Sequence, residues 1–136
     1  MDIAAAQHFL RENHHAVLAT SRADGRPQLS PVTVAIDDAG RVIISTRETA
    51  VKVRNLRRDP RLSLAAFTDR FYGEWVQVEG TAEIIALPEA LDLLVDYYRR
   101  ASGEHRDWDE YREAMIDQHR VIVRFAIARA GPNVSG

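Results

Sequence analysis

The residues best suited to chemistry lie in one basic segment near the middle of the chain. Between Arg47 and Arg61 lie six of the eighteen basic residues and only two acidic ones, and Lys52 is the only lysine of the sequence. Ser45 and Thr46 end the apolar run before this segment, which itself predicts a short helix. Hydroxyl groups, the free amides of a helix N-terminus and an ammonium group all bind phosphate. The pattern predicts an anion site on Ser45, Thr46 and Lys52, although a solvated surface helix has the same composition.

The composition of the chain limits the classes of protein to which it can belong. The 136 residues, 46% of them apolar, predict a single globular domain over residues 1–136. The absence of cysteine excludes disulfides and thiolate metal ligands and suits a reducing interior. A net charge of -2 argues against a nucleic-acid partner and favours a small anionic ligand. No apolar run approaches the roughly 20 residues of a membrane span. The N-terminus also lacks a secretory pattern, so we expect no membrane partner and a cytoplasmic location.

Other constellations of reactive residues are weak. His14 and His15 are adjacent, so on a strand they point to opposite faces and cannot bind one metal ion. The sequence has no His-x-x-x-His spacing, no Gly-x-Ser-x-Gly motif of hydrolases and no Gly-x-Gly-x-x-Gly motif of dinucleotide-binding folds. We therefore predict no metal site and assign no catalytic residue.

The elements that must position the basic segment follow from apolar periodicity. Alternating apolar residues predict six strands, at His15–Ser21, Gln28–Ile36, Arg41–Thr46, Leu62–Phe67, Glu74–Ile85 and Arg120–Ala128. Helical spacing predicts four helices, at Asp2–Glu12, the basic segment up to Asp59, Pro88–Arg100 and Asp107–Gln118. Between and after these elements we expect a hairpin turn at Asp24-Gly25, a bulge at Gly80 and a polar tail at Gly131–Gly136.

This order of elements predicts a mainly β fold. Several short strands with tight antiparallel connections and a few peripheral helices are typical of a small β-barrel. A barrel of this size is filled by its own side chains, so a ligand must lie in an outer groove or between subunits.

Four segments resemble the pyridoxamine 5'-phosphate oxidase-like split-barrel family. Ala16–Val32 is similar to its opening hairpin, Lys52–Arg61 to its phosphate-binding helix and Trp75–Ala82 to the strand that follows. Tyr97–Tyr111, with the run Gly103-Glu104-His105-Arg106-Asp107-Trp108, is similar to the actinobacterial branch that uses the deazaflavin cofactor F-420. The resemblance covers nearly the whole chain and implies a six-stranded antiparallel split β-barrel that forms a homodimer.

The family binds a flavin or deazaflavin in a cleft between the two subunits, which implies roles for seven residues. The cofactor-binding residues expected from the resemblance are Gln28 and Ser30 near the ring system, Ser45, Thr46 and Lys52 at the phosphate, and Asn55 and Arg58 nearby. Relatives often carry an arginine one or two positions before the lysine, where this chain has Ala50 and Val51. Either Arg47 or Arg54 is therefore expected to supply the second cation, or the phosphate binds less tightly.

The function that the resemblance implies is that of a coenzyme F-420-dependent oxidoreductase. Such a protein transfers a hydride between the cofactor and a small organic substrate, and the cofactor supplies the hard chemistry. The anionic oligoglutamate tail of F-420 fits the surplus arginines of the basic segment, namely Arg54, Arg57, Arg58 and Arg61. Two alternatives stay open: the same fold with FMN as an oxidase or reductase, and a non-catalytic protein that binds a cofactor or haem.

Overall fold

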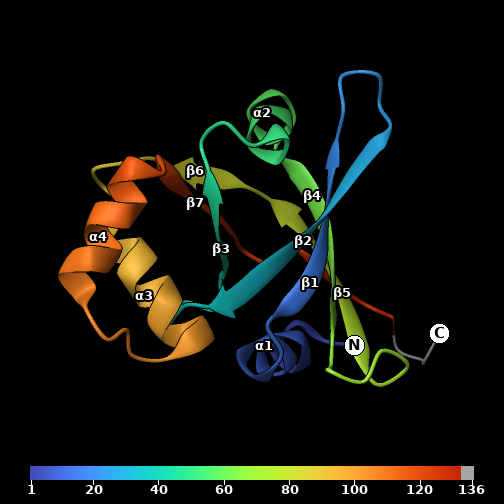
Figure 1. Cartoon of the computed structure of the whole chain (residues 1–136). Coiled ribbons are helices and arrows are strands. Elements are labelled where there is room, and N and C mark those ends of the chain that lie inside the picture. The colour runs from blue at the N-terminus through green and yellow to red at the C-terminus, as the bar shows by residue number, and fades with distance from the viewer. Residues whose placement is uncertain (133–136) are drawn as a thin grey trace.

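The computed structural model describes residues 1–132, which form a curled antiparallel sheet with helices around it (Figure 1). Within this range the strands are β1 (His15–Ser21), β2 (Pro27–Ile36), β3 (Val42–Arg47), β4 (Arg61–Phe67), β5 (Trp75–Thr81), β6 (Glu83–Ile85), β7 (Arg120–Phe125) and β8 (Arg129–Gly131). The helices of the same range are α1 (Ile3–Glu12), α2 (Val51–Arg58), α3 (Ala90–Ser102) and α4 (Trp108–Asp117). The sheet order is β6-β7-β3-β2-β1-β4-β5-β8, so the prediction of a mainly β, antiparallel fold is confirmed.

β2 is shared between the two halves of the curled sheet. Pro27–Thr33 pair with β1, whereas Val34–Ile36 pair with β3. β2 and β3 diverge beyond that short pairing, as Figure 1 shows, and the end of β3 pairs with β7 alone. Ser45 and Thr46 lie at this opening, at the point where the two halves of the sheet separate.

The predicted number of six strands is wrong, because residues 1–132 contain eight. The segment predicted as one strand from Glu74 to Ile85 is divided at Ala82: β5 pairs with β4, and β6 pairs with β7. At Gly80 a Cβ atom would lie 2.5 Å from a ring carbon of Phe125 and 2.6 Å from the carbonyl oxygen of Ala126. A glycine at this position therefore lets the chain cross closely over the end of β7 as it passes from one half of the sheet to the other.

The C-terminal part of the chain also differs from the prediction. The strand expected from Arg120 to Ala128 ends at Phe125, and the chain then forms a second short strand, β8. Gly131, predicted to begin a polar tail, pairs with Gln77 of β5. The rest of the predicted tail, residues 133–136, lies outside the described residues.

Local signals in the sequence explain the elements that were predicted well. The Asp2 carboxylate accepts a hydrogen bond from the Ala5 amide at 2.7 Å and caps α1, as its position before the apolar stripe indicates. β1 has the predicted bounds, with alternate residues buried. α2 ends at Arg58, immediately before Asp59-Pro60, because the residue before a proline disfavours helical geometry.

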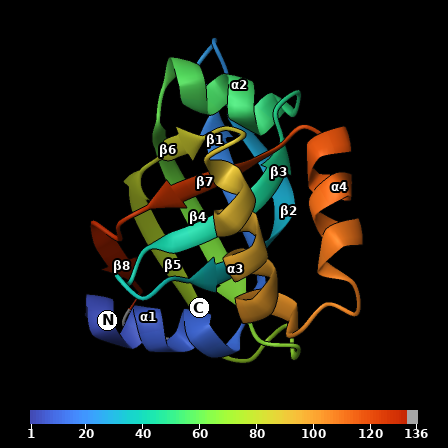
Figure 2. The ribbon, with the colours of Figure 1, turned by 90° about the vertical axis from the view of Figure 1, so that its left-hand side faces the viewer.

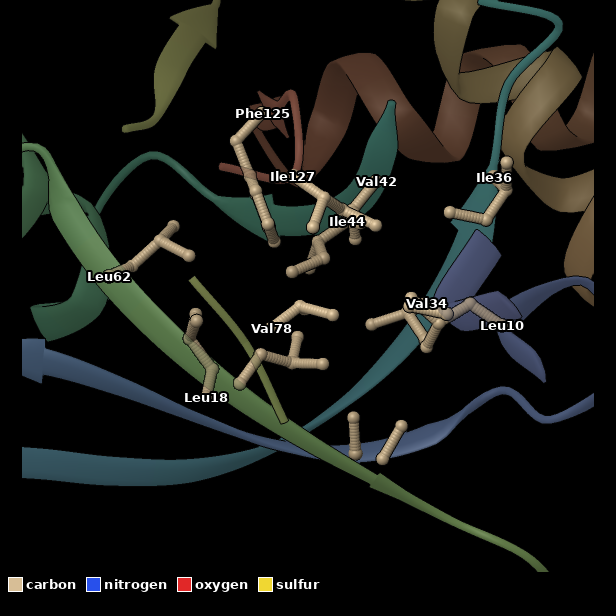
Figure 3. Packing of buried hydrophobic residues seen from close by; sticks show 14 of the residues in the cluster. Leu10, Leu18, Val34, Ile36, Val42, Ile44, Leu62, Val78, Phe125 and Ile127 are labelled. Atoms are coloured by element: carbon tan, nitrogen blue, oxygen red, sulfur yellow. The ribbon is translucent and has the colours of Figure 1, made fainter. Parts of the chain in front are cut away.

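Apolar side chains fill the inside of the curled sheet (Figure 3). Leu18, Ile44, Val78 and Phe125 point into this core from four strands, and Leu10 of α1 lies against its open end beside Val34. Full burial of one such side chain stabilises a fold by about 1.5–3 kcal/mol. The filled interior leaves the outside of the sheet as the place for a ligand.

A second apolar cluster joins α3 and α4 to the other face of β3 and β7. Leu94 of α3 and Met115 of α4 pack there against Ile43 and Ile122. Figure 2 shows the two helices beside these strands, with α2 at one end of the sheet and α1 at the other. None of the helices in residues 1–132 is long and apolar enough to cross a membrane.

Candidate functional site

A groove of about 420 Å³ lies at the opening where β2 and β3 diverge. Two hydroxyl side chains of β3, Ser45 and Thr46, line it together with two cations, Lys52 of α2 and Arg120 of β7. The remaining wall comes from β2 and from the two helices beside β3 (Figure 2), through Pro31, Val32, Thr33, Tyr97, Tyr98, Ser102, Tyr111 and Met115. The structure therefore brings Ser45, Thr46 and Lys52 into one groove, as the sequence pattern predicts.

The start of α2 lies beside this groove, which Lys52 lines. Ala50 occupies the N-cap position, and no side chain in the described part of the chain caps the helix there. The first amides of a helix have no partner within the helix itself. Lys52 is half-buried in the first turn, and its pKa lies below the usual range because of burial and because of the nearby Arg120. An anion bound here would relieve both penalties.

Arg120 is a groove residue that the sequence prediction missed. In the register of β3 and β7 it lies directly opposite Arg47, although the two are far apart in the sequence. Burial and then the charge of Arg47 lower the pKa of Arg120. No carboxylate within residues 1–132 lies within 4 Å of the side-chain nitrogens of Lys52, Arg47 or Arg120. No local sequence signal reveals Arg120, because only the pairing of distant strands brings it to the groove.

Two tyrosines of the groove wall have structural hydrogen bonds. The hydroxyl of Tyr97 donates to the carbonyl oxygen of Thr33 at 2.8 Å, and that of Tyr111 donates to the carbonyl oxygen of Leu94 at 2.8 Å. Burial raises the pKa of Tyr97, while a hydrogen bond with the Ser45 backbone acts in the opposite direction. Burial raises the pKa of Tyr111 to about 12. Both phenols stay protonated at neutral pH and hold the wall in place.

Gln28 and Ser30 lie on β2, just before the β2 residues that line the groove. Their partners across the sheet are Thr20 and Leu18 of β1. The Gln28 side-chain oxygen and the Ser30 hydroxyl are buried and have no hydrogen-bond partner among the described residues. A buried polar atom without a partner costs about 1–3 kcal/mol. Neither Gln28 nor Ser30 is part of the groove lining, although Pro31 of the same strand is.

Asn55 and Arg58 contact β1 and are not part of the groove lining. The buried Asn55 amide donates to the Thr20 hydroxyl at 3.1 Å. The Arg58 guanidinium donates to the Asn55 side-chain oxygen at 3.0 Å and to the Ser21 carbonyl oxygen at 2.7 Å. These bonds fasten α2 to β1, and neither Asn55 nor Arg58 lines the groove.

Other arginines of the basic segment are engaged or stand apart from the groove. Arg57 pairs with Glu48, and Arg61 pairs with Asp59 at 2.8 Å. Hydrogen bonds from Arg61 lower the pKa of Asp59 to about 2. Arg54 is exposed on α2 and does not line the groove. The surplus of free cations expected along α2 is therefore smaller than composition suggests.

The outward face of the strands next to the groove is apolar. Val17 of β1 lies between Pro31 of β2 and Ala65 of β4, and Ala19 lies opposite Leu29. The exposed fraction is 61% for Leu29 and 36% for Val17. Side chains of this kind on a strand face are typical of a contact surface.

Comparison with known proteins confirms the resemblance to the family, and the F-420-dependent branch stays a prediction. Residues 3–132 match the family described as pyridoxamine 5'-phosphate oxidase. A conserved hypothetical protein from Mycobacterium tuberculosis is 31% identical, with a TM-score of 0.78 over 100% of this chain and 92% of that chain. An F-420 reductase is 21% identical, with a TM-score of 0.71 over 92% of this chain and 94% of that chain.

A third similar structure is a heme binding protein from Mycobacterium smegmatis. It is 22% identical, with a TM-score of 0.71 over 96% of this chain and 53% of that chain. At this level of identity, the likeness to the reductase and to the heme binding protein extends to the fold alone.

Proposed function

We propose that this chain, which belongs to the pyridoxamine 5'-phosphate oxidase family, is an F-420-dependent oxidoreductase that acts on a small organic substrate. The observation that carries the proposal is the groove in which Lys52 and Arg120 lie beside Ser45 and Thr46. A half-buried cation without an acidic partner is unfavourable unless an anion binds to it. The ribityl phosphate of a deazaflavin is such an anion.

The phosphate end of the cofactor would be held by three kinds of donor. Lys52 supplies a compact positive charge, Ser45 and Thr46 supply hydroxyl groups, and the start of α2 supplies backbone amides. Hydrogen bonds to a charged partner contribute about 1.5–3 kcal/mol each. This set binds the phosphate strongly and leaves the ring free to extend along β2.

Gln28 and Ser30 would orient the ring of the cofactor. Their buried, unpartnered oxygen atoms lie on the strand that also lines the groove, so hydrogen bonds to a heterocycle would satisfy them. When bound, the deazaflavin supplies the hydride, whereas the chain supplies binding, orientation and the exclusion of water. We assign no proton donor, because the hydroxyls of Tyr97 and Tyr111 donate to backbone carbonyls.

F-420 is proposed ahead of FMN for two reasons. The segment Tyr97–Tyr111 resembles the F-420-dependent branch, and a reductase of that cofactor shares the fold of this chain. Haem stays the second alternative: no histidine of residues 1–132 lines the groove and the chain has no cysteine, so an axial ligand would have to come from Tyr98 or Met115. FMN carries the same ribityl phosphate, so the same groove accepts it and only a binding measurement distinguishes the two.

The proposal includes a homodimer with the cofactor between the subunits. The apolar outward face around Val17 and Leu29 supports this assembly, because it lies on strands next to the groove. We expect a total buried area above about 2,000 Å², as in obligate dimers. Light scattering should therefore give twice the chain mass, and a stable monomer near 15.4 kDa at micromolar concentration would contradict the assembly.

The test of the proposed function is the affinity for F-420 and for FMN at two salt concentrations. We expect F-420 to bind more tightly than FMN, because exposed charge contacts to its tail contribute about 0.2–1 kcal/mol each. Salt screens these contacts, so the difference in affinity should decrease as the salt concentration rises. Since Arg57, Arg58 and Arg61 already bind other groups of the chain, the difference in affinity between the two cofactors should be modest. An FMN preference would move the assignment to the flavin alternative, and failure to bind either cofactor would refute the proposed function.

A further inference from the structure

Arg120 lines the groove, although neither the pattern of the basic segment nor the family resemblance gives it a role. We propose that Arg120 is the second cation of the phosphate site and binds the same phosphate as Lys52. The inference rests on the proposed function, since the phosphate is that of the bound cofactor. Relatives often carry an arginine at the position of Ala50 or Val51. Arg120 would supply the positive charge that this chain lacks there.

The pairing of β3 with β7 brings Arg120 to the phosphate site. Thr46 pairs with Val121 and Arg47 with Arg120, so the start of β7 lies directly beside the hydroxyl-bearing end of β3. Ser45, Thr46, Lys52 and Arg120 all line the same groove. The two proposed phosphate cations therefore come from separate elements, α2 and β7, and meet where β3 ends.

The guanidinium of Arg120 is held in a way that leaves donors for a ligand. Its Nε atom donates to the side-chain oxygen of Gln118 at 2.9 Å. An arginine has five N–H donors in a planar fork, so the terminal nitrogens remain for an anion. A planar fork of this kind matches the oxygen atoms of a phosphate group.

The positive charges of this region also favour the binding of an anion. Arg47 and Arg120 lie directly opposite each other on neighbouring strands, an arrangement that destabilises a sheet when both are charged. Lys52 adds a third positive charge, and the pKa of Lys52 and that of Arg120 are both lowered by burial and by a neighbouring cation. Within the described residues no carboxylate within 4 Å offsets these charges. A phosphate bound between Lys52 and Arg120 would do so.

Arg47 and Arg54, which the sequence analysis offered as the second cation, fit this role less well than Arg120. Arg54 is exposed on α2 and is not part of the groove lining. Arg47 is exposed at the end of β3 and acts on Arg120 through its charge. Arg120 is the arginine that is both partly buried and in the groove.

The experiment compares FMN with riboflavin, which lacks the phosphate, on wild-type protein and on four variants: Arg120→Gln, Arg120→Lys, Lys52→Gln and Arg54→Gln. Arg120→Gln should weaken FMN binding by about 10- to 100-fold, the scale of one charge-assisted hydrogen bond, and leave riboflavin binding unchanged. Arg120→Lys should recover part of the FMN affinity, because it restores the charge without the planar fork. Arg54→Gln is the matched control and should leave both affinities unchanged.

The outcomes separate this inference from the proposed function. Equal losses for FMN and riboflavin in Arg120→Gln would show a general structural effect and overturn the inference. Unchanged FMN affinity in Arg120→Gln, together with a loss in Lys52→Gln, would overturn it while leaving the proposed function intact.

If wild-type protein does not bind FMN, inorganic phosphate becomes the probe, whether or not F-420 binds. Failure to bind F-420 as well means that the proposed function fails. The NMR signal of the single lysine, Lys52, then reports on the groove. A shift on phosphate addition that is lost in Arg120→Gln would support the two-cation site, and no shift in wild-type protein would overturn it.

Discussion

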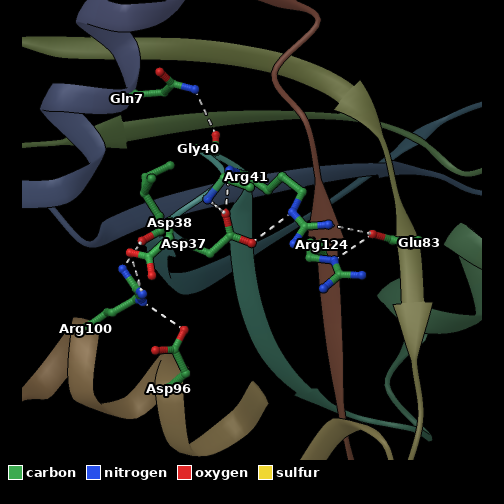
Figure 4. A network of polar contacts seen from close by, with 11 residues as sticks. Gln7, Asp37, Asp38, Gly40, Arg41, Glu83, Asp96, Arg100 and Arg124 are labelled. Carbon is green, nitrogen blue, oxygen red and sulfur yellow. Dashed lines mark hydrogen bonds and ion pairs between the residues drawn. The ribbon is translucent and has the colours of Figure 1, made fainter. Parts of the chain in front are cut away.

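Two regions of the molecule contain several basic side chains and differ in whether carboxylates pair with them. Around the turn between β2 and β3, arginines of the turn itself, of α3 and of β7 form a network of ion pairs (Figure 4). The shortest N–O distances of these pairs are 2.9 Å for Arg41–Asp37, 2.8 Å for Arg100–Asp96 and 2.6 Å for Arg124–Glu83. In the groove, by contrast, Lys52 and Arg120 have no such partner among residues 1–132. The same residue types are therefore paired with carboxylates in one region and have no carboxylate partner among the described residues in the other.

The comparison gives a physical criterion for function. In the network a carboxylate offsets the charge of each arginine, and removing that partner leaves an unsatisfied charge. A cation in the groove raises that free energy until an anion binds. Variants in the network should therefore change stability and leave cofactor affinity alone, whereas variants in the groove should do the reverse.

The largest change in affinity is expected for Lys52→Ala. Loss of the ammonium should weaken F-420 binding by about 1.5–3 kcal/mol, as for a charge-assisted hydrogen bond. The free energy of unfolding should stay the same or rise slightly, because the repulsion between Lys52 and Arg120 disappears. Fluorescence titration and urea denaturation measure the two quantities. An unchanged affinity in a folded variant would remove Lys52 from the site.

The matching change in stability is expected for Asp37→Ala. One carboxylate oxygen of Asp37 accepts hydrogen bonds from the amides of Ala39 and Arg41, and the other pairs with the Arg41 side chain. Only 12% of this side chain is exposed, so its loss should lower the free energy of unfolding by about 1–3 kcal/mol. F-420 affinity should not change.

The neighbouring Asp38 provides the control for Asp37. It pairs with Arg100 at 3.0 Å, but 96% of its side chain is exposed. Asp38→Ala should therefore cost less than about 1 kcal/mol. Equal losses for the two variants would show that burial does not distinguish these carboxylates.

A smaller and pH-dependent effect is expected for Glu83→Gln. A hydrogen bond from Arg124 lowers the pKa of Glu83 below its usual value of 4.5, so this carboxylate stabilises the fold above that value. Its contribution is lost as pH falls through the lowered pKa. Because the pair is half-exposed, the difference from wild type should stay below about 1 kcal/mol at pH 7 and disappear in acid. Urea denaturation from pH 7 to pH 3 measures it, and a difference that grows in acid would contradict the assignment.

Features that depend on local sequence could be predicted, and features that depend on distant pairing could not. The cap at Asp2, the bounds of β1 and the end of α2 at Asp59-Pro60 follow from neighbouring residues. The division of β5 from β6 depends on which strand each one meets, β4 or β7. A single sequence does not reveal those partners.

The same distinction applies to the candidate site. Ser45, Thr46 and Lys52 are close in sequence, so their pattern predicted the groove residues that β3 and α2 provide. Arg120 lies at the groove because β7 pairs with β3, so the sequence pattern did not predict it. Asn55 and Arg58 lie in the predicted helix, but composition does not tell which side of α2 meets β1.

The central claim is that Lys52 binds the cofactor phosphate, and its position as the only lysine allows a direct measurement. Protein labelled with carbon-13 at the lysine Cε position gives one side-chain resonance, whose pH titration reports the Lys52 pKa. In the free protein we expect this pKa below its usual value of 10.5, because of burial and of Arg120. Saturation with F-420 should raise it, since an adjacent phosphate favours the charged ammonium. A titration midpoint that stays the same when fluorescence shows the cofactor bound would contradict the account.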